Sequence, residues 1–65
     1  MKPRFIKIPS SGNSIAINIK YIILIEESSK GSRITLSLID EDGKNKIIYT
    51  DEEIDVVIHR IEGNY

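Results

Sequence analysis

The sequence contains no cysteine and no tryptophan, and it has a single histidine. Without cysteine, neither a disulfide framework nor a thiolate metal site can hold this small chain together. Side-chain packing has to provide the stability instead, and a chain of this size can add to it by self-association. A metal site needs at least three ligands, and the sequence does not offer them at a recognisable spacing.

The sequence also lacks a strong net charge and a long hydrophobic run. The formal charge is −1, so the overall basic footprint of a nucleic-acid-binding protein is missing. The longest purely apolar run, Tyr21 to Ile25, is far shorter than the ~20 residues that cross a bilayer. The opening stretch MKPRFIKIPSSG has no apolar segment typical of a secretory signal, because Arg4, Lys7 and Pro9 interrupt it. We expect a cytoplasmic protein.

The 65 residues that are present fit one domain, residues 1–65. The hydrophobic residues make up 40% of the chain and are mainly isoleucine, and this β-branched composition favours strands over a helical bundle. A domain of this length buries only about 60% of the surface of its unfolded chain, so the core must be thin.

Alternating apolar residues predict a series of short strands separated by turn-forming residues. The cluster Pro9 to Ser14 predicts a hairpin turn, Asn18 to Lys20 a short second turn, and Asp40 to Gly43 another hairpin turn. In Tyr21 to Ile25 both faces are apolar, which is typical of a central strand covered on both sides. The expected strands are residues 4–8, 15–19, 21–25, 33–39 and 45–49.

The C-terminal segment has the pattern of an amphipathic helix. Thr50 followed by Glu53 matches a capping box, which places the start of the helix at Thr50. An apolar stripe follows at helical spacing, with Gly63 as the terminating residue. The stripe consists of Ile54, Val57, Ile58 and Ile61. Together these patterns predict an α+β fold, a small antiparallel sheet of four to five strands followed by one C-terminal helix packed on it.

No residue set has the spacing of a catalytic, cofactor-binding or metal-binding site. His59 lies one helical turn after Asp55, but no Ser or Cys is placed to act as a nucleophile beside it. The carboxylates of Glu26 and Glu27, and those of Asp40 to Asp42, fall where strands end and are typical of solvated turns. We therefore expect no enzyme activity, no cofactor and no metal.

The hydrophobic strand is the candidate interaction surface, carried by Tyr21, Ile23 and Ile25. One amphipathic helix offers a single apolar stripe and cannot cover both faces of this strand. A second copy of the chain or another protein is expected to cover the remaining face, so we expect a homo-oligomer, in the first place a dimer, or a protein partner.

A second hypothesis is a small nucleic-acid-binding domain, because the basic residues are unevenly distributed. The candidate contacts are Lys2, Arg4, Lys7, Lys30 and Arg33. Against this hypothesis, the polar face of the predicted helix is acidic and the aromatic residues are too scattered to form a base-stacking platform.

The succession FIKI, SIAINI, IILIEES and SRITLSL resembles the FlbD-type small flagellar and swarming proteins and similar short bacterial proteins. In those proteins an Asn begins a turn before a strand that ends in Ile-Glu, which corresponds here to Asn18 and Ile25-Glu26. Ile19 and Lys20 stand where Pro or Asp is usual after this Asn. The rhythm of Ile19 to Glu26, with strands giving way to a final helix, is also similar, more weakly, to the LytTR DNA-binding domain. These resemblances imply a small regulatory module and, for the second, a nucleic-acid contact.

Overall fold

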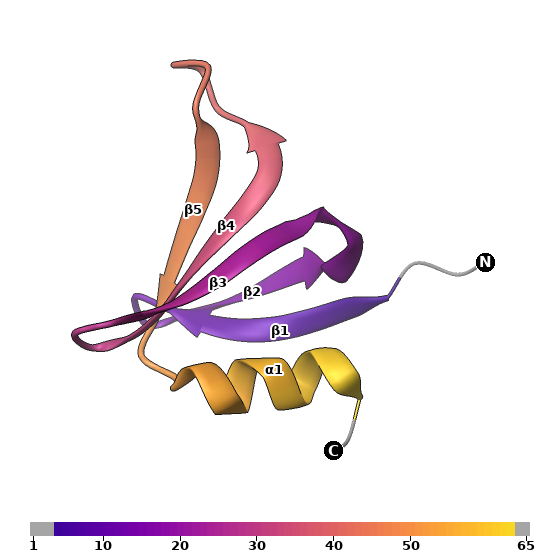
Figure 1. The fold of residues 1–65 in the computed structure, drawn as a ribbon, viewed down its shortest axis with the longest axis vertical. Helices are drawn as coiled ribbons and strands as arrows, with labels where there is room; N and C mark the ends of the chain where they lie inside the picture. Colours follow the sequence, from indigo (N-terminus) through magenta and orange to yellow (C-terminus); the bar gives the residue numbers. More distant parts are fainter. Residues whose placement is uncertain (1–3, 64–65) are drawn as a thin grey trace.

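The computed structural model describes residues 4–63 and has an α+β fold (Figure 1). Five strands form two antiparallel sheets, one with the order β1-β2 and one with the order β3-β4-β5. The elements are β1 (Phe5–Ser10), β2 (Asn13–Asn18), η1 (Ile19–Tyr21), β3 (Ile22–Ser28), β4 (Gly31–Ile39), β5 (Asn45–Thr50) and α1 (Ile54–Glu62). The predicted strands and the C-terminal helix are confirmed, but the strands do not form one sheet.

The β1–β2 hairpin is closed by Ser11 and Gly12, which lie between the paired residues Ser10 and Asn13. Both have positive φ angles, 50° and 83°, as a type I′ turn requires. This turn matches the right-handed twist of the strands, so the hairpin register follows from local sequence. It places Ile6 and Ile8 of β1 beside the isoleucines of β2 on the core side.

The short helix η1 separates the two sheets. The side-chain oxygen of Asn18 accepts a hydrogen bond from the backbone amide of Lys20 at 3.2 Å, and this bond fixes the start of η1. The predicted turn from Asn18 to Lys20 is therefore confirmed. It redirects the chain, so that β3 starts a new sheet instead of extending the first one.

The interpretation of Tyr21 to Ile25 as a central strand is wrong. The central strand of the larger sheet is β4, and β3 lies at its edge. Ile23 and Leu24 are 59% and 48% exposed. A β-bulge interrupts the pairing of β3 with β4 between Ile22 and Leu24. The bulge breaks the alternation of faces, so that Ile23 and Leu24 are both exposed although they are neighbours in the strand.

The two sheets meet at one corner, where β1 approaches β5. There the Ser10 hydroxyl donates a hydrogen bond to the backbone carbonyl of Tyr49 at 2.8 Å. Away from this corner the β4–β5 hairpin projects from the body of the molecule (Figure 1). Its ladder is irregular between Thr35 and Ile39, and the Asn45 side-chain amide donates to the Leu36 carbonyl at 2.9 Å within this irregular stretch.

The helix begins at Ile54 and not at Thr50, so the predicted capping box does not form. Thr50 is the last residue of β5 and is buried opposite Ser32. Its hydroxyl accepts a hydrogen bond from the Glu52 amide at 3.2 Å. Glu53 occupies the N-cap position without a side-chain capping bond. Pairing in the sheet has overridden a local helix-start pattern.

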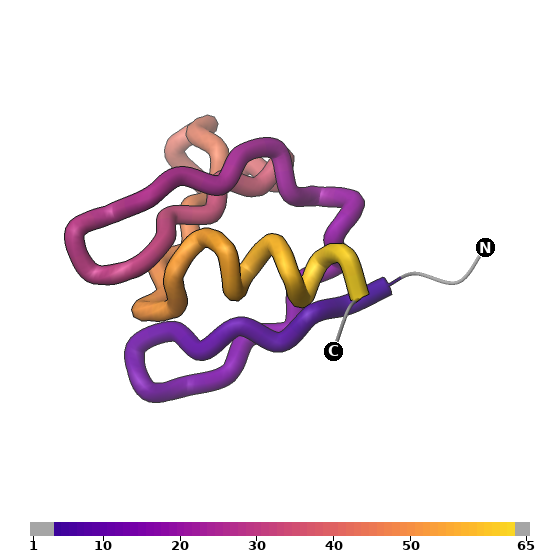
Figure 2. Tube along the Cα trace, turned by 60° about the horizontal axis from the view of Figure 1, so that its bottom comes forward, coloured from indigo at the N-terminus to yellow at the C-terminus, as the bar shows by residue number. Residues whose placement is uncertain are grey.

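The helix packs against β1, β3 and β4, and Figure 2 shows it running between the β1–β2 hairpin and the larger sheet. Val57 is fully buried, and Ile61 packs against the core from the same stripe, but Ile58 is 38% exposed, so the predicted stripe is only partly covered. Gly63 ends the helix in the left-handed conformation, as predicted. The buried hydrophobic residues are Ile6, Ile8, Ile17, Ile34, Leu36, Ile48 and Val57.

Candidate functional site

The face of the three-stranded sheet that points away from the core carries two rows of side chains. Residues paired across antiparallel strands share one face. The pairing therefore aligns Leu24 of β3 with Thr35 of β4 and Ile47 of β5. The next row consists of Glu26, Arg33 and Tyr49. We call these six residues the outer sheet face.

Three large apolar side chains of the outer sheet face are exposed to solvent. Leu24 is 48% exposed, Ile47 44% and Tyr49 58%. The neighbouring positions on the same strands, such as Ile34 and Ile48, are buried on the opposite face. Within residues 4–63, the helix and the β1–β2 hairpin pack on that opposite face, and the outer sheet face stays uncovered.

The charged pair on the outer sheet face is internally matched. Arg33 donates from Nη2 to Oε1 of Glu26 at 2.7 Å and from Nε to the same oxygen at 3.1 Å. Hydrogen bonding to Glu26, together with its charge and a smaller contribution from Tyr49, raises the pKa of Arg33 above its ordinary value. An arginine is charged at any ordinary pH, so Arg33 and Glu26 form an ion pair without net charge next to the apolar row.

The structure distributes the three predicted interaction residues over different surroundings. Ile23 is exposed in the bulge beside the outer sheet face. Ile25 pairs with Ile34 and packs against the core. Tyr21 lies in η1, where the Lys20 ammonium is 5.2 Å from the centre of its ring. Of the three, Ile23 alone adjoins the outer sheet face.

The candidate nucleic-acid contacts do not form one basic surface in the part of the chain that the structure describes. Arg33 is paired with Glu26. Arg4 donates from Nη2 to the Arg60 carbonyl at 2.9 Å, at the helix C-terminus, where a cation interacts favourably with the helix dipole. Lys7 and Lys30 are exposed, on β1 and in the β3–β4 turn respectively. Lys2 lies outside the described residues.

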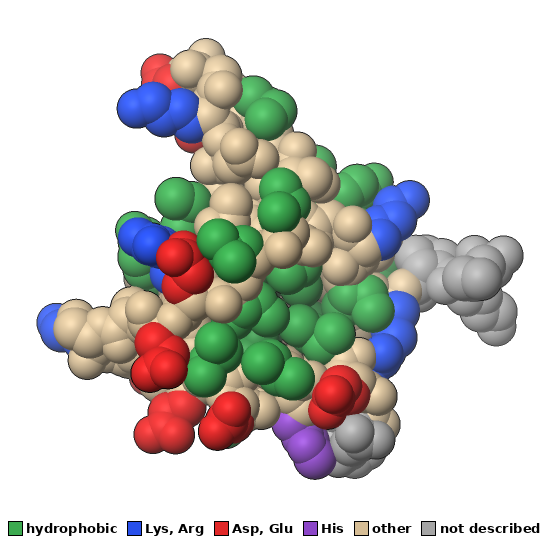
Figure 3. Space-filling model, viewed as in Figure 1, with side chains coloured by type: hydrophobic (Ala, Val, Ile, Leu, Met, Phe, Trp, Pro, Cys, Tyr) green, Lys and Arg blue, Asp and Glu red, His purple; other side chains and the backbone are tan. Residues whose placement is uncertain are grey.

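An apolar groove of about 290 Å³ lies between β2 and the projecting β4–β5 hairpin. Ile15 and Ile17 of β2 line one side, and Leu36 and Leu38 of β4 line the other. Lys46 is its charged lining residue. We call it the inter-sheet groove. Hydrophobic side chains are also visible over the middle of the molecule, between the helix and the projecting hairpin (Figure 3).

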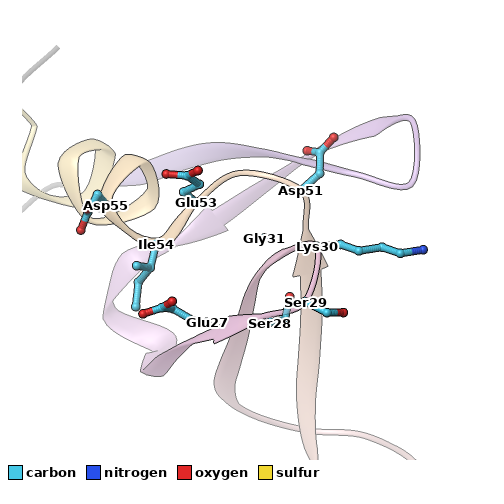
Figure 4. A pocket seen from close by; sticks show the side chains of 9 residues that line it. All are labelled: Glu27, Ser28, Ser29, Lys30, Gly31, Asp51, Glu53, Ile54 and Asp55. Carbon is cyan, nitrogen blue, oxygen red and sulfur yellow. The ribbon is translucent and has the colours of Figure 1, made fainter.

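A larger hollow of about 600 Å³ lies between the β3–β4 turn and the start of the helix, and it is polar (Figure 4). Its side chains do not converge: Asp51, Glu53 and Lys30 point in different directions. Among residues 4–63, no group of three His, Asp or Glu side chains is arranged to hold a metal ion. His59 is exposed on the helix. Among the described residues, the candidate contact surfaces are therefore the apolar ones, the outer sheet face and the inter-sheet groove.

Sequence reasoning missed Leu24, Ile47 and Tyr49 as parts of one surface. The alternation along β5 could have indicated part of this surface. Ile48 and Thr50 point inward, so Ile47 and Tyr49 point outward. The cross-strand alignment with Leu24 needed the bulge, which the sequence did not reveal.

Comparisons with known protein families, with curated proteins and with solved structures each find no match for this chain. Within residues 4–63, no helix is long and apolar enough to span a membrane.

Proposed function

We propose that this chain is a noncatalytic protein-interaction module whose contact surface is the outer sheet face. The observation that carries the proposal is the exposed row of Leu24 and Ile47 beside Tyr49, on a face that no described element covers. The buried cores of interfaces are more apolar than the rest of the surface, are enriched in aromatic residues such as tyrosine and contain few charged residues. The only charges among the six residues of the outer sheet face are those of Glu26 and Arg33, and they are paired with each other.

The proposed occupant of the outer sheet face is a different protein. Three strands spaced ~4.8 Å apart, over about six residues each, give this face a footprint of roughly 300 Å². A symmetric dimer uses the same patch on both copies, so two outer sheet faces reach only part of the ~800 Å² per partner in a stable interface. A different protein can extend its contact around the edges of the sheet, for example onto Ile23.

The nucleic-acid hypothesis has less support. Two of its candidate contacts, Arg4 and Arg33, hold the helix terminus and the Glu26 carboxylate. A nucleic-acid complex loses affinity steeply as salt is added, because condensed counterions are released on binding. An apolar protein contact responds weakly to salt, so titration of the salt concentration separates the two hypotheses.

The test is site-specific photo-crosslinking in the native host. A photoreactive side chain at Ile47 is expected to give a discrete adduct with another protein, and Leu24→Lys in the same chain is expected to abolish it. The same photoreactive side chain at exposed His59 is the matched control and should not give that adduct. Identical adducts from both positions, or an adduct that survives Leu24→Lys, would contradict the proposal. An adduct between two copies of this chain would show that a second copy, and not a different protein, occupies the outer sheet face.

A further inference from the structure

The free edge of β2 differs from the other strand edges in lacking any feature that blocks pairing. Exposed edges are usually protected by charged residues, proline or a bulge. The strand β2, with the sequence NSIAIN, has no charged residue and no proline. Its register with β1 runs without interruption from Asn18 to Asn13.

The other edges are protected or occupied. On β3 the bulge at Ile23 and the acidic pair Glu26-Glu27 interrupt the edge. One end of β5 approaches β1, where the Tyr49 carbonyl accepts a hydrogen bond from the Ser10 hydroxyl, and the projecting part of β5 carries the charged residue Lys46. Among the described residues, β2 pairs with β1 alone. Figure 2 shows the start of β2 at the lower rim of the molecule, before the strand passes behind β1.

The hydrogen-bond phase of the hairpin identifies which backbone groups point outward. The Ile19 amide donates to the Arg4 carbonyl at 3.0 Å, so hydrogen-bonded positions alternate from Ile19 back along β2. The amides and carbonyls of the intervening residues Ser14, Ala16 and Asn18 therefore point to the free edge. Pro9 agrees with this phase, because it lies opposite Ser14 at a position where no amide is needed.

We infer that β2 pairs antiparallel with β2 of a second copy of this chain, about a twofold axis at Ala16. Ala16 of each copy then exchanges amide and carbonyl hydrogen bonds with Ala16 of the other, and the Asn18 amide donates to the Ser14 carbonyl of the second copy. The two hairpins become one four-stranded sheet. This surface is separate from the outer sheet face, and the inference does not rest on the proposed function.

The side chains of β2 fit this self-pairing. Alanine at the axis brings two small side chains together, and no charges face each other. The same register sets Ile15 opposite Ile17 of the second copy, on the side of the inter-sheet groove. Ile15 is only partly buried in one chain, so this β-branched pair covers apolar surface that one chain leaves open. Serine and asparagine pair on the other side.

The area of the contact sets its strength. Six residues at ~3.3 Å each make a contact strip about 20 Å long and one strand wide. Such a strip covers far less than the ~800 Å² that each partner buries in a standard interface. The dimer is therefore weak and concentration-dependent. Its mass is expected to rise from that of the 7.4 kDa chain towards twice this value as the protein is concentrated.

The experiment combines sedimentation equilibrium with amide hydrogen exchange measured by NMR. In the wild type, the Ala16 and Asn18 amides should become protected as the concentration increases, while the Leu24 amide does not change. Ala16→Lys places two ammonium groups at the axis and should weaken the dimer at least about tenfold. Ala16→Pro removes the outward amide without touching the β1 ladder and should leave a monomer.

The matched control is His59→Lys, which adds a charge on the exposed helix face and should dimerise like the wild type. A wild-type chain that stays monomeric up to about 1 mM would overturn the inference. A dimer that persists in Ala16→Lys without amide protection at Ala16 would also overturn it. If Ala16→Pro does not fold, Ala16→Lys and the wild-type exchange data still decide the question. Leu24→Lys should leave this dimer intact, because Leu24 lies on the outer sheet face. A failure of the proposed protein contact can therefore be distinguished from a failure of the β2 pairing.

Discussion

The hydroxyl group of Ser32 donates a hydrogen bond of 2.8 Å to the backbone carbonyl of Glu52. Ser32 is fully buried in the central strand, and Glu52 lies in the link between β5 and the helix. The Glu52 carboxylate also accepts hydrogen bonds from Nε and Nη2 of Arg60, at 3.0 and 2.6 Å. This chain of contacts attaches the helix to the sheet.

Replacing Ser32 by alanine should destabilise the fold by about 1–2 kcal/mol, because it leaves the partly buried Glu52 carbonyl without this partner. Urea unfolding measures the change as a lower midpoint at constant slope. Ser37→Ala, at an exposed position of the same strand, is the control and should stay within about 0.5 kcal/mol of the wild type. Equal effects of the two substitutions would contradict the role of Ser32.

Gly31→Ala should destabilise the fold by more than about 3 kcal/mol. Gly31 has a φ of 147°, and a Cβ atom there would collide with the Thr50 carbonyl oxygen and the Asp51 backbone. Gly43→Ala is the control, since its φ of 78° also disfavours alanine but its Cβ would meet open space. The control should cost only about 1–2 kcal/mol. Thermal unfolding followed by circular dichroism distinguishes the two variants, and similar losses would refute the steric explanation.

Thr50→Ala should cost about 1 kcal/mol through the loss of the Glu52 amide's partner, whereas Glu53→Ala should change stability by less than about 0.5 kcal/mol. In a capping box both residues would matter and would be coupled. The structure places Thr50 in β5 and gives Glu53 no capping bond. A double-mutant cycle of the two substitutions should therefore show no coupling energy. A clear coupling would restore the capping box.

His59→Ala should leave both stability and partner binding nearly unchanged. His59 is exposed on the helix, which packs on the core side of the larger sheet and not on the outer sheet face. Surface substitutions of this kind usually stay within about 0.5 kcal/mol. Unfolding in urea and the crosslinking yield from position 47 provide the two readouts, and a loss of crosslinking with stability intact would show that the helix takes part in binding.

Much of the secondary structure could be predicted because its causes are local. Ser11-Gly12 supplies the positive φ angles of a tight hairpin, and Asn18 bonds to a backbone amide two residues away. Such signals operate within a few residues. The five strands and the helix were therefore recognisable from the pattern alone.

The position of each strand within the sheets depends on distant contacts that the pattern does not contain. Ser32 reads as a loop residue because it is polar and small, yet its bond to Glu52 allows it to be buried in the central strand. Thr50 has the local pattern of a helix cap, but pairing with Ser32 keeps it in a strand. Ile23, one of the three predicted interaction residues, lies beside the outer sheet face. The apolar row of that face could not be predicted, because it depends on the register that follows the bulge.

The order of strand pairing has a consequence for how the chain folds. Each strand pairs with its neighbour in sequence, so the hairpins form from local contacts and fold quickly. The bond from Arg4 to the Arg60 carbonyl joins residues 56 positions apart, so we expect it to form late, after the local hairpin contacts. Interactions that are absent from the transition state affect unfolding more than folding. In stopped-flow kinetics, Arg4→Met should therefore accelerate unfolding and leave the folding rate nearly unchanged.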